Sequence, residues 1–434
     1  MGLGHVVFAI AATAVAMTML GDIAAQAQSA PQESVLSRPR PEFDPNGIAM
    51  TEVISAIFGA KSGDATDRGL IESLVLYPTF DVETEFDSNV FRTPSGAKTD
   101  RIMHYRPGLA VRSDWENHAL SLAVTSDMGR FDTYGGENYD DAGAVLEGRL
   151  DIEEFWTVTP TLSYRHGHEL RGSPDDPGAG TGPTTYDLFS YGISSTYQRD
   201  AWIVRPGLRH DRSDFHDSGL VDNDDRDRRV TTASTRVGFE FSPDTILYVE
   251  PSHNWVRYDQ RLDNFGVRRD STGDQGLVGL TWDVSGVTFL DFAAGYMRQR
   301  YDDPTLSTVA GPTYRTGILW NATGLITVSV NGARSIRETT LQGAGGVFET
   351  SLAGRIDYEL RDNILVDLRA SWQNDDYRGL QRKDDILRVG IGFTYFLGRN
   401  LVIGGSLNRD TRSSDASGAD YEDYRALLRI GTRF

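Results

Sequence analysis

The last twelve residues of the chain largely alternate between apolar and polar side chains. One phase holds Tyr424, Ala426, Leu428, Ile430, Thr432 and Phe434, and the other holds Asp423, Arg425, Arg429 and Arg433. A period of two is the pattern of a pleated strand whose faces meet different surroundings. Such a strand, ending on an aromatic residue, predicts an outer-membrane β-barrel whose apolar face meets lipid and whose arginine face lines an aqueous interior.

The composition is compatible with this prediction and excludes several other classes of protein. The chain has no cysteine, so it offers no disulfide, thiolate metal site or cysteine nucleophile. Its formal net charge is −19, and no stretch resembles a basic nucleic-acid footprint. We therefore expect no nucleic-acid partner.

The beginning of the chain has the features of an export signal. Residues 6–20 form an apolar run that is followed by Ala25-Gln26-Ala27, a small-residue cleavage pattern. We predict that residues 1–27 are a signal peptide. The alternative, a membrane-anchor helix, needs about 20 apolar residues. No later stretch reaches that length, so a chain embedded in a membrane would have to form a closed barrel.

Residues 28–73 differ from the rest of the chain. Residues 38–47 are rich in proline and turn-forming residues, which interrupt regular secondary structure. They are followed by apolar residues at helical spacing, namely Met50, Val53, Ile54, Ile57 and Phe58. We expect a periplasmic extension with one short amphipathic helix. Two roles fit this extension: a linker resting on the barrel rim, or a plug or docking site for a partner.

Residues 74–434 repeat one unit, which is an alternating run, a tight turn, a second alternating run and a longer polar connection. Turn-forming residues predict tight connections near 115–117, 198–200, 242–244, 284–286, 321–324, 361–363 and 398–400. The longer connections are expected near 88–100, 131–140, 171–184, 213–229, 261–273, 301–311, 337–346, 374–384 and 410–420. The fold class predicted for 74–434 is all-β, a transmembrane antiparallel up-and-down β-barrel of about 18 strands.

Five prolines lie inside the expected strands and raise an objection to this count. They are Pro78, Pro107, Pro160, Pro206 and Pro251, and all share the outward phase. Proline removes a hydrogen-bond donor from the ladder and normally argues against a central strand. We interpret the five as a repeated bulge or unpaired site. The alternative is that some strands end there, which would reduce the count to 16.

The tryptophans give an independent test, because all seven fall on the outward phase of their strands. Those beside tight turns are Trp115, Trp156, Trp202, Trp282 and Trp320, and those near the long connections are Trp255 and Trp372. This placement predicts two aromatic girdles at the membrane interfaces. Phe434 is expected at the periplasmic girdle, as an assembly signal for the barrel-assembly machinery.

The inward phase carries charges of both signs. The residues predicted to face the lumen are Arg106, Arg149, Arg165, Arg205, Arg209, Arg236, Glu240, Asp367, Arg369, Arg388, Arg425, Arg429 and Arg433. Unpaired charges could not stay in a dry core, so the pattern indicates a hydrated lumen. The alternative is an interior so linked by salt bridges that it conducts nothing.

Several short strings resemble a known family. They are Arg38-Pro39-Arg40-Pro41-Glu42-Phe43-Asp44-Pro45, Phe86-Asp87-Ser88-Asn89-Val90-Phe91, Arg106-Pro107-Gly108-Leu109, Glu137-Asn138-Tyr139 and Glu169-Leu170-Arg171-Gly172-Ser173-Pro174-Asp175. Over residues 38 to 434 the chain is similar to the putative β-barrel porin 2 family of Gram-negative outer membranes. The resemblance implies an outer-membrane barrel, linked in some relatives to exopolysaccharide secretion, and it carries over no catalytic residue.

Candidate metal-binding residues are few. His166 and His168 share a strand face and could bind a metal with Glu169 or Asp175, although two histidines near a loop are more often incidental. Another candidate is an acidic loop that holds Asp222, Asp224, Asp225 and Asp227. The loop lacks the spacing of a calcium loop, so we interpret it as solvated charge, bridged to lipopolysaccharide through divalent ions. We assign no metal site and no cofactor.

An enzymatic role is also not expected. A lipase-type site would need an outward histidine next to a nucleophile. His253 is the one in-strand histidine that alternation places outward, and its neighbour Ser252 points inward. We therefore predict no catalytic residues and no enzyme.

The resulting functional hypothesis is a porin-like outer-membrane channel, either a conduit for exopolysaccharide export or a passive diffusion porin for small solutes. The alternative is a structural or adhesive surface barrel with a closed lumen. Expected partners are outer-membrane lipid and lipopolysaccharide, the barrel-assembly machinery and polysaccharide export components.

Overall fold

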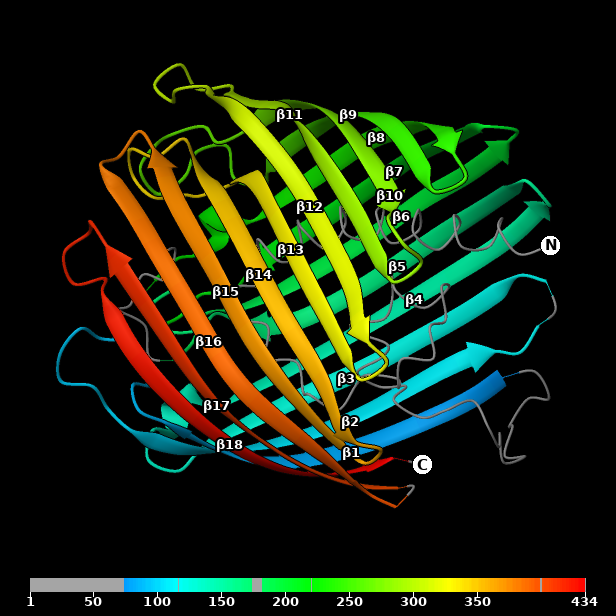
Figure 1. Ribbon diagram of the computed structural model, residues 1–434. Coiled ribbons are helices and arrows are strands. Elements are labelled where there is room, and N and C mark those ends of the chain that lie inside the picture. The colour runs from blue at the N-terminus through cyan, green and yellow to red at the C-terminus, as the bar shows by residue number, and fades with distance from the viewer. Residues whose placement is uncertain (1–73, 116, 174–181, 220, 399, 434) are drawn as a thin grey trace.

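The computed structural model describes residues 74–433 apart from 116, 174–181, 220 and 399. The predicted signal peptide (1–27), the predicted extension (28–73) and Phe434 lie outside the described residues. Most of the described chain forms antiparallel strands (Figure 1). They are β1 Leu74–Asp87, β2 Asp100–Ser113, β3 Ala119–Phe131, β4 Tyr139–Glu153, β5 Trp156–His168, β6 Thr185–Arg199, β7 Trp202–Phe215, β8 Arg228–Ser242, β9 Thr245–Tyr258, β10 Ser271–Asp283, β11 Thr288–Tyr301, β12 Val309–Thr323, β13 Ile326–Arg337, β14 Gly346–Arg361, β15 Ile364–Arg378, β16 Arg382–Leu397, β17 Leu401–Ser414 and β18 Tyr421–Arg433.

The strands close into one barrel. Each strand pairs with the next along the chain, and the 18-stranded sheet closes where β1 pairs with β18. The closing register runs from Thr79 opposite Arg433 to Asp87 opposite Arg425. Closure leaves no free strand edge, which is the condition for a sheet to span a membrane. The predicted fold class and the count of 18 are confirmed, and the alternative count of 16 is wrong.

The connections differ between the two ends of the barrel. At one end, five of the turns consist of two residues each, at 154–155, 200–201, 243–244, 324–325 and 362–363. At the other end, which we call the long-loop rim, the connections include 88–99, 169–184, 216–227 and 259–270. Two connections at this rim contain a short 3₁₀ turn, which is η2 Gly135–Glu137 between β3 and β4 and η3 Asp224–Arg226 between β7 and β8. By the rule for outer-membrane barrels, the long connections face the outside.

Two connections differ from the sequence prediction. The turn at 154–155 was not predicted, because Glu153, Glu154 and Phe155 include no turn-forming residue. The connection expected at 374–384 is only 379–381, because β15 continues to Arg378 and β16 begins at Arg382. The error has a simple cause, since the polar residues that suggested a loop belong to strand ends beyond the apolar band.

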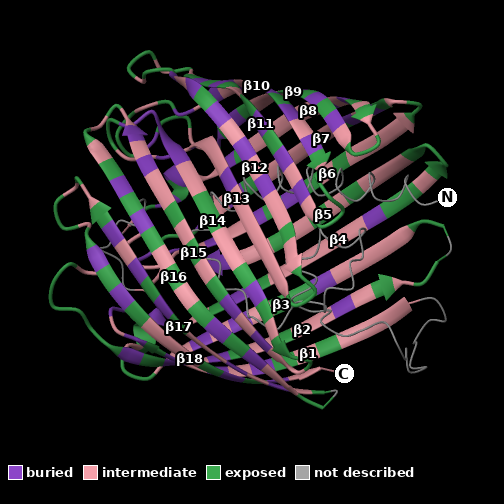
Figure 2. Ribbon diagram, viewed as in Figure 1, coloured by how far each residue is buried: buried purple, intermediate pink, exposed green. Residues whose placement is uncertain are grey.

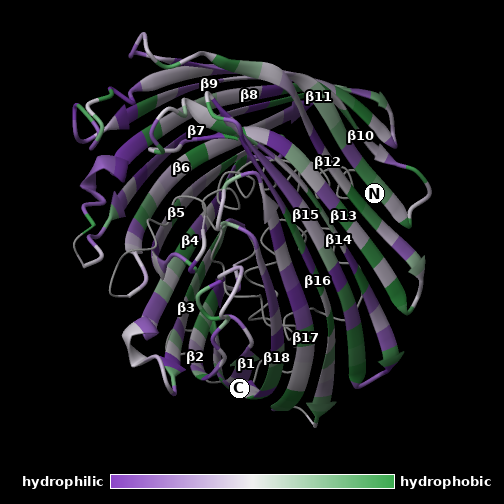
Figure 3. Ribbon diagram, turned by 90° about the vertical axis from the view of Figure 1, so that its left-hand side faces the viewer, coloured by the Kyte–Doolittle hydropathy of each residue, from purple (hydrophilic) through white to green (hydrophobic). Residues whose placement is uncertain are grey.

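The two faces of each strand have opposite character. In β18 the exposed apolar side chains include Leu428 and Ile430, at 61% and 50%, whereas Asp423 and Arg429 are 0% and 6% exposed. Buried and exposed segments therefore alternate along the strands (Figure 2), as do hydrophilic and hydrophobic ones (Figure 3). A barrel that exposes aliphatic residues and buries charged ones reverses the usual arrangement of a soluble protein. The apolar outer face is suited to lipid.

The outward prolines are unpaired sites within continuous strands. Pro107 lies opposite Phe80 of β1, but the β2–β3 pairing has a gap between Tyr105 and Gly108 and resumes in the same register. Matching gaps occur beside Pro160, Pro206 and Pro251. Because the register does not shift, these sites are not bulges. At each of these sites the strand loses hydrogen bonds to one neighbouring strand but keeps those to the other neighbour. The strand therefore continues past the proline, and the number of strands stays at 18.

Within the described residues, no helix has the length and apolar character required to cross a membrane.

Candidate functional site in the barrel interior

All the charged residues predicted to face the lumen lie on the phase opposite to the exposed apolar residues of their strands. They are Arg106 on β2, Arg149 on β4, Arg165 on β5, Arg205 and Arg209 on β7, Arg236 and Glu240 on β8, Asp367 and Arg369 on β15, Arg388 on β16, and Arg425, Arg429 and Arg433 on β18. Arg149 is 46% exposed, whereas Arg205, Arg236 and Arg429 are almost fully buried. The interior surface is therefore a wall of charged groups, most of which are in contact with one another.

One group of contacts centres on Glu83 of β1, beside the closure of the barrel. The guanidinium of Arg106 donates to Glu83 Oε1 at 2.5 Å and to Asp127 Oδ2 at 2.9 Å. Arg429 Nη1 lies 3.7 Å from the same Glu83 oxygen. His104 Nδ1 lies 3.1 Å from Asp127 Oδ1. This group joins β1, β2, β3 and β18 through side chains as well as through the backbone ladder.

A second group centres on Glu250 of β9. Arg236 donates from Nε to Glu250 Oε2 at 2.6 Å, and Arg315 donates through both terminal nitrogens to the two carboxylate oxygens at 3.1 Å. Asp291 of β11 accepts from the Tyr248 hydroxyl at 3.1 Å and lies 3.8 Å from Arg236 Nη1. A fork-shaped guanidinium matches a carboxylate in this two-bond geometry. The group ties β8 to β9, β11 and β12.

A third group follows β13 to β15. Arg337 of β13 lies 3.3 Å from Glu349 on the adjacent β14 and 3.1 Å from Asp375 on β15, one strand further along. On β15, Asp367 forms an ion pair with Arg369, with 2.9 Å between Oδ2 and Nε, and Asp367 is 0% exposed. The three groups together make the wall polar around most of its circumference.

The sequence prediction missed His104, Asp127 and Glu250 in these groups, and also the inward Asp410 of β17. The signal for all four was present, because they share the phase of predicted inward residues on the same or the paired strand. Asp127, for instance, lies on the phase of Ala123, which is opposite Ala110 on the inward face of β2.

At the long-loop rim, Arg92 extends from the β1–β2 connection into the barrel. Its guanidinium lies 3.4 Å from Asp410 of β17 and 3.7 Å from Asp423 of β18. Burial by itself would lower the pKa of Arg92, but Tyr421, Asp410 and Asp423 outweigh it and hold the pKa above its usual value. The connection is thus fixed to the strands that close the barrel.

Arg269 performs a similar role on the opposite wall. Its side chain is 1% exposed and lies 2.8 Å from Asp263 within the β9–β10 connection. The guanidinium also donates to the backbone oxygens of Thr339 at 3.0 Å and Leu341 at 3.2 Å, in the β13–β14 connection. One long connection is therefore held by a side chain from another.

A pocket lies inside the long-loop rim, between the Glu83 group and the connections above it. Both acidic and basic side chains line it, among them Glu85, Asp87, Arg92, His104, Arg106, Glu137, Tyr139, His168, Arg171 and Arg425. Arg171 and Glu137 form a two-bond pair across its edge, at 2.8 and 2.9 Å. The pocket is polar and carries charges of both signs.

The tryptophans predicted to form girdles are all on the outside, with exposures between 39% and 54%. Trp156 and Trp202 begin β5 and β7, Trp282 lies one residue before the end of β10, and Trp115 lies in the β2–β3 connection. Trp320 lies near the end of β12, while Trp255 and Trp372 lie toward the long-loop rim on β9 and β15. Their contact with the membrane interfaces stays a prediction.

His166 and His168, considered in the sequence as candidate metal ligands, point to different sides of the barrel wall. His168 turns toward the interior, where its ring stacks on Tyr139 with centroids 3.8 Å apart and its Nδ1 lies 2.8 Å from Asp141. His166 stays outside and contacts Asp187 instead. The strand ends at His168, so the strict alternation that placed both on one face no longer applies. Of the expected metal partners, Glu169 pairs with Arg226 at 3.0 Å and Asp175 lies outside the described residues.

The acidic loop is less solvated than expected. Asp225 is 5% exposed and accepts from the backbone nitrogen of Asn264 at 3.1 Å, and Asp227 accepts from that of Phe215 at 2.6 Å. Burial raises the pKa of Asp227 to about 6, and it also raises the pKa of Asp225. These two carboxylates hold neighbouring loop backbone, a role that composition alone could not indicate.

His253 faces outward, as expected, and its Nδ1 lies 2.7 Å from Asp274 Oδ1. It was expected to be the one in-strand histidine with this orientation, but His166 and His210 share the outward phase. The hydroxyl of Ser252 donates to Gln275 at 3.4 Å, on the other face of the strand from His253. His253 and Ser252 therefore do not form a nucleophile and base pair.

Comparisons with known proteins give one family and a set of similar structures. A comparison with curated proteins finds no match. Among solved structures, the outer membrane protein OpdK from Pseudomonas aeruginosa is 12% identical, covering 83% of this chain and 99% of its own, with a TM-score of 0.44. OccK3 (OpdO) from the same organism is 14% identical, covering 83% and 96%, with a TM-score of 0.43. The FrpB iron transporter from Neisseria meningitidis is 10% identical, covering 81% and 64%, with a TM-score of 0.42.

The family model described as putative beta-barrel porin 2 matches residues 71–434. The similarity expected from residue 38 therefore begins later, and the string from Arg38 to Pro45 lies outside the matched segment. The match includes every strand of the closed 18-stranded barrel. The chain belongs to the putative beta-barrel porin 2 family and is a porin-like β-barrel of the outer membrane.

Proposed function

We propose that this barrel is a passive channel through which small hydrophilic solutes cross the outer membrane. The observation that carries the proposal is the closed ring of 18 strands whose inner face is charged. Barrels of 16 to 18 strands are wider than their wall side chains can fill, whereas those of 8 strands are filled. Charged inner side chains are stable next to water and costly in a dry core.

The distribution of charge supports polar solutes as the cargo. Arginines and carboxylates alternate around the wall, and both line the pocket inside the long-loop rim. A solute with hydrogen-bonding groups finds partners of both signs along this surface. An apolar solute would instead have to displace water from charged groups without replacing its hydrogen bonds.

Conductance in a planar lipid bilayer tests the proposal. The full chain, purified from the outer membrane, is expected to give discrete current steps that scale with salt concentration. Liposome swelling then measures size, with fast entry expected for a pentose and slow or no entry for a trisaccharide. Current at background, with folding confirmed by heat-modifiable migration, would contradict the channel and favour a structural or adhesive barrel with a closed lumen.

The narrower role in exopolysaccharide export comes only from the resemblance, and no contact described above favours it. A deletion strain separates the two roles. Unchanged secreted polymer, together with slower uptake of small solutes, is expected for a diffusion channel. Loss of secreted polymer would indicate the export role. The expected contacts with lipopolysaccharide, the assembly machinery and export components stay predictions.

Our proposal includes no catalytic step. Activity toward ester or peptide substrates that is lost in His253→Ala would contradict this part of it.

A further inference from the structure

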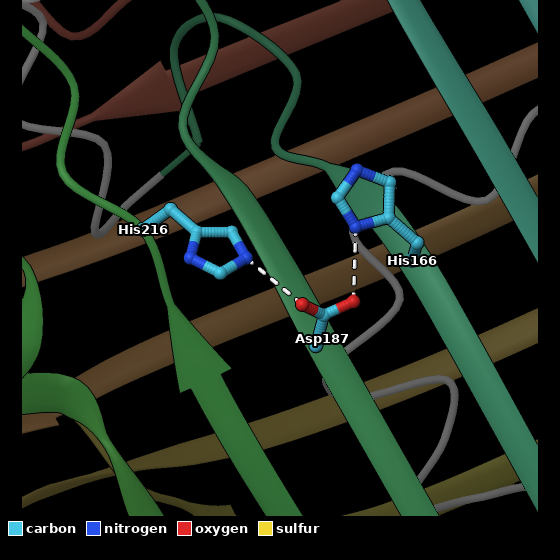
Figure 4. A group of neighbouring side chains, drawn as sticks. All are labelled: His166, Asp187 and His216. Carbon is cyan, nitrogen blue, oxygen red and sulfur yellow. Dashed lines mark hydrogen bonds and ion pairs between the residues drawn. The ribbon is translucent and has the colours of Figure 1, made fainter.

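Three side chains that are far apart in the sequence converge on the outer surface at the long-loop rim. They are His166 on β5, Asp187 on β6 and His216, which follows the last residue of β7 (Figure 4). The Asp187 carboxylate lies between the two imidazole rings and faces both of them (Figure 4). None of the three contributes to the interior charge groups.

The distances are those of direct contact. His166 Nδ1 lies 2.9 Å from Asp187 Oδ1, and His216 Nε2 lies 2.9 Å from Asp187 Oδ2. One ligand atom from each residue can be chosen so that all three lie within 4.8 Å of one another. The Tyr164 hydroxyl donates to Asp187 Oδ1 at 2.6 Å and so orients the carboxylate from outside the trio.

The barrel wall itself fixes this arrangement. His166 and Asp187 are directly opposite each other in the β5–β6 ladder. The backbone nitrogen of His216 donates to the backbone oxygen of Thr185 at 2.9 Å, which holds the start of the β7–β8 connection beside β6. Two of the residues are on regular strands and the third is tied to one of them. A site built on strands is held in place better than one built only on loops.

We propose that His166, Asp187 and His216 form a binding site for a divalent transition-metal ion of the zinc type. Two imidazole nitrogens and one carboxylate oxygen are the donor set that Zn²⁺ accepts, with a further position left for water or an outside ligand. The ion replaces the hydrogen bonds that now join the imidazoles to the carboxylate, so the facing nitrogens must be deprotonated. Tyr164 keeps its hydrogen bond and acts as a positioning residue.

The site is accessible without any opening of the barrel. The side chains of His166, Asp187 and His216 are 33%, 30% and 44% exposed. An ion from the outside medium can therefore reach them directly. Once bound, it would join β5 and β6 to the start of the β7–β8 connection, and thereby restrain that connection.

The barrel contains a natural control for this proposal. His253 and Asp274 form an outward histidine–carboxylate pair on β9 and β10, with a separation of 2.7 Å and similar exposure. The second partner of that carboxylate is Arg298, at 2.9 Å, instead of another histidine. A cationic arginine cannot coordinate a metal, so the pair has two ligands where the proposed site has three.

Zinc titration of the untagged full chain in detergent tests the site. The expected result by isothermal calorimetry is one Zn²⁺ per barrel, retained in excess Mg²⁺, because imidazole ligands favour zinc over hard cations. His166→Ala and His216→Ala are each expected to weaken binding by at least about tenfold. His253→Ala is expected to bind zinc as the unaltered chain does.

Two further measurements exclude binding by another carboxylate of the same connection and effects that arise only from misfolded variants. Asp222→Asn alters a carboxylate of the same connection, next to Asp217 and Asp224, and is expected to leave zinc binding unchanged. Co²⁺ bound to the unaltered chain should give visible absorption bands that zinc abolishes, which needs no variant to fold. The proposal is overturned if the unaltered chain binds no zinc, if the double variant H166A/H216A binds it equally well, or if H253A loses as much affinity as H216A.

Discussion

Arg236 and Glu250 face each other across neighbouring strands inside the barrel, with 2.6 Å between Nε and Oε2 and less than one tenth of either side chain exposed. Glu250 also accepts both terminal nitrogens of Arg315. Glu250 is thus the closest carboxylate to both guanidinium groups, while Asp291 lies farther away, 3.8 Å from Arg236 and 3.7 Å from Arg315. The stability of this part of the wall therefore depends strongly on the Glu250 carboxylate.

Glu250→Gln should destabilise the barrel and shift its ion preference toward anions. The substitution keeps the shape of the side chain but leaves Arg236 and Arg315 without their shared counter-charge. Removing one partner of a buried pair costs about 3 to 5 kcal/mol. Urea unfolding followed by tryptophan fluorescence measures the loss, and reversal potentials in a salt gradient measure the preference.

The exposed pair of Arg409 and Glu422 offers a matched control, since both side chains are about half exposed. Glu422→Gln removes a carboxylate of the same kind and is expected to leave the stability almost unchanged, because water screens an exposed ion pair. Equal losses in the two variants would mean that burial of the Glu250 group does not matter for stability.

Arg106 and Arg429 share the Glu83 carboxylate but should differ in importance. Arg106 contacts Glu83 at 2.5 Å and Asp127 at 2.9 Å, whereas Arg429 approaches only Glu83, at 3.7 Å. Arg106→Ala leaves two buried carboxylates without their closest cation and should lower the yield of folded barrel. Arg429→Ala should assemble normally and shift the reversal potential toward cation preference. A folded yield that falls as far in Arg429→Ala would contradict this order.

The tryptophans should report contact with lipid interfaces. In chains that retain one tryptophan at a time, Trp202 and Trp372 represent the two ends of the barrel. Both are expected to be quenched by brominated acyl chains in a bilayer, more strongly when the bromine lies near the headgroups than near the chain ends. Indole rings favour this interfacial depth because the ring is apolar and its N–H is polar. Strong quenching only by a water-soluble agent would contradict the girdles.

The β13–β14 connection should loosen as the pH rises. Burial raises the pKa of Glu338 to about 7, against the opposing effects of Arg228, Tyr258 and Arg269. A carboxyl whose pKa is higher in the folded state stabilises that state only while it is protonated. The contribution is full below the ordinary carboxyl pKa of about 4.3. It is lost as the pH passes through about 7.

Hydrogen exchange at residues 339–345 checks this prediction. After correction for intrinsic rates, exchange should be faster at pH 8 than at pH 5.5. Glu338→Gln should remove most of the difference, because an uncharged amide can still accept from the Tyr258 hydroxyl, now 3.2 Å away. A pH effect of the same size in the variant would assign the change to another group.

The sequence predicted the number and phase of the strands because both depend on local pattern. Alternation places Leu428 outside and Arg429 inside wherever β18 pairs, and turn residues such as Asp362 and Asn363 show where the chain reverses. The turn after Glu153 carries no such signal and was missed. Pro107 could be interpreted as an unpaired site, but only the register shows which neighbour is lost.

The contacts of the site could be predicted only in part. Phase showed that Arg236 faces the interior, but its partner depends on which strand lies beside it and in what register. The same limit applies to the three residues of the proposed metal site, whose neighbours depend on strand order and register. His166 was noted as a candidate ligand, yet Asp187 and His216 come from other strands and connections, and His168 leaves the shared face where β5 ends.

The contacts of Arg269 determine how the outer surface responds to inserted segments and how antibodies recognise it. Because its side chain binds backbone oxygens of the β13–β14 connection from within the β9–β10 connection, neither segment keeps its shape alone. A synthetic peptide copied from 338–345 would lack that support, so antibodies raised against it should bind the intact cell poorly. A foreign epitope inserted beside Arg269 would disturb a surface more than 70 residues away in sequence.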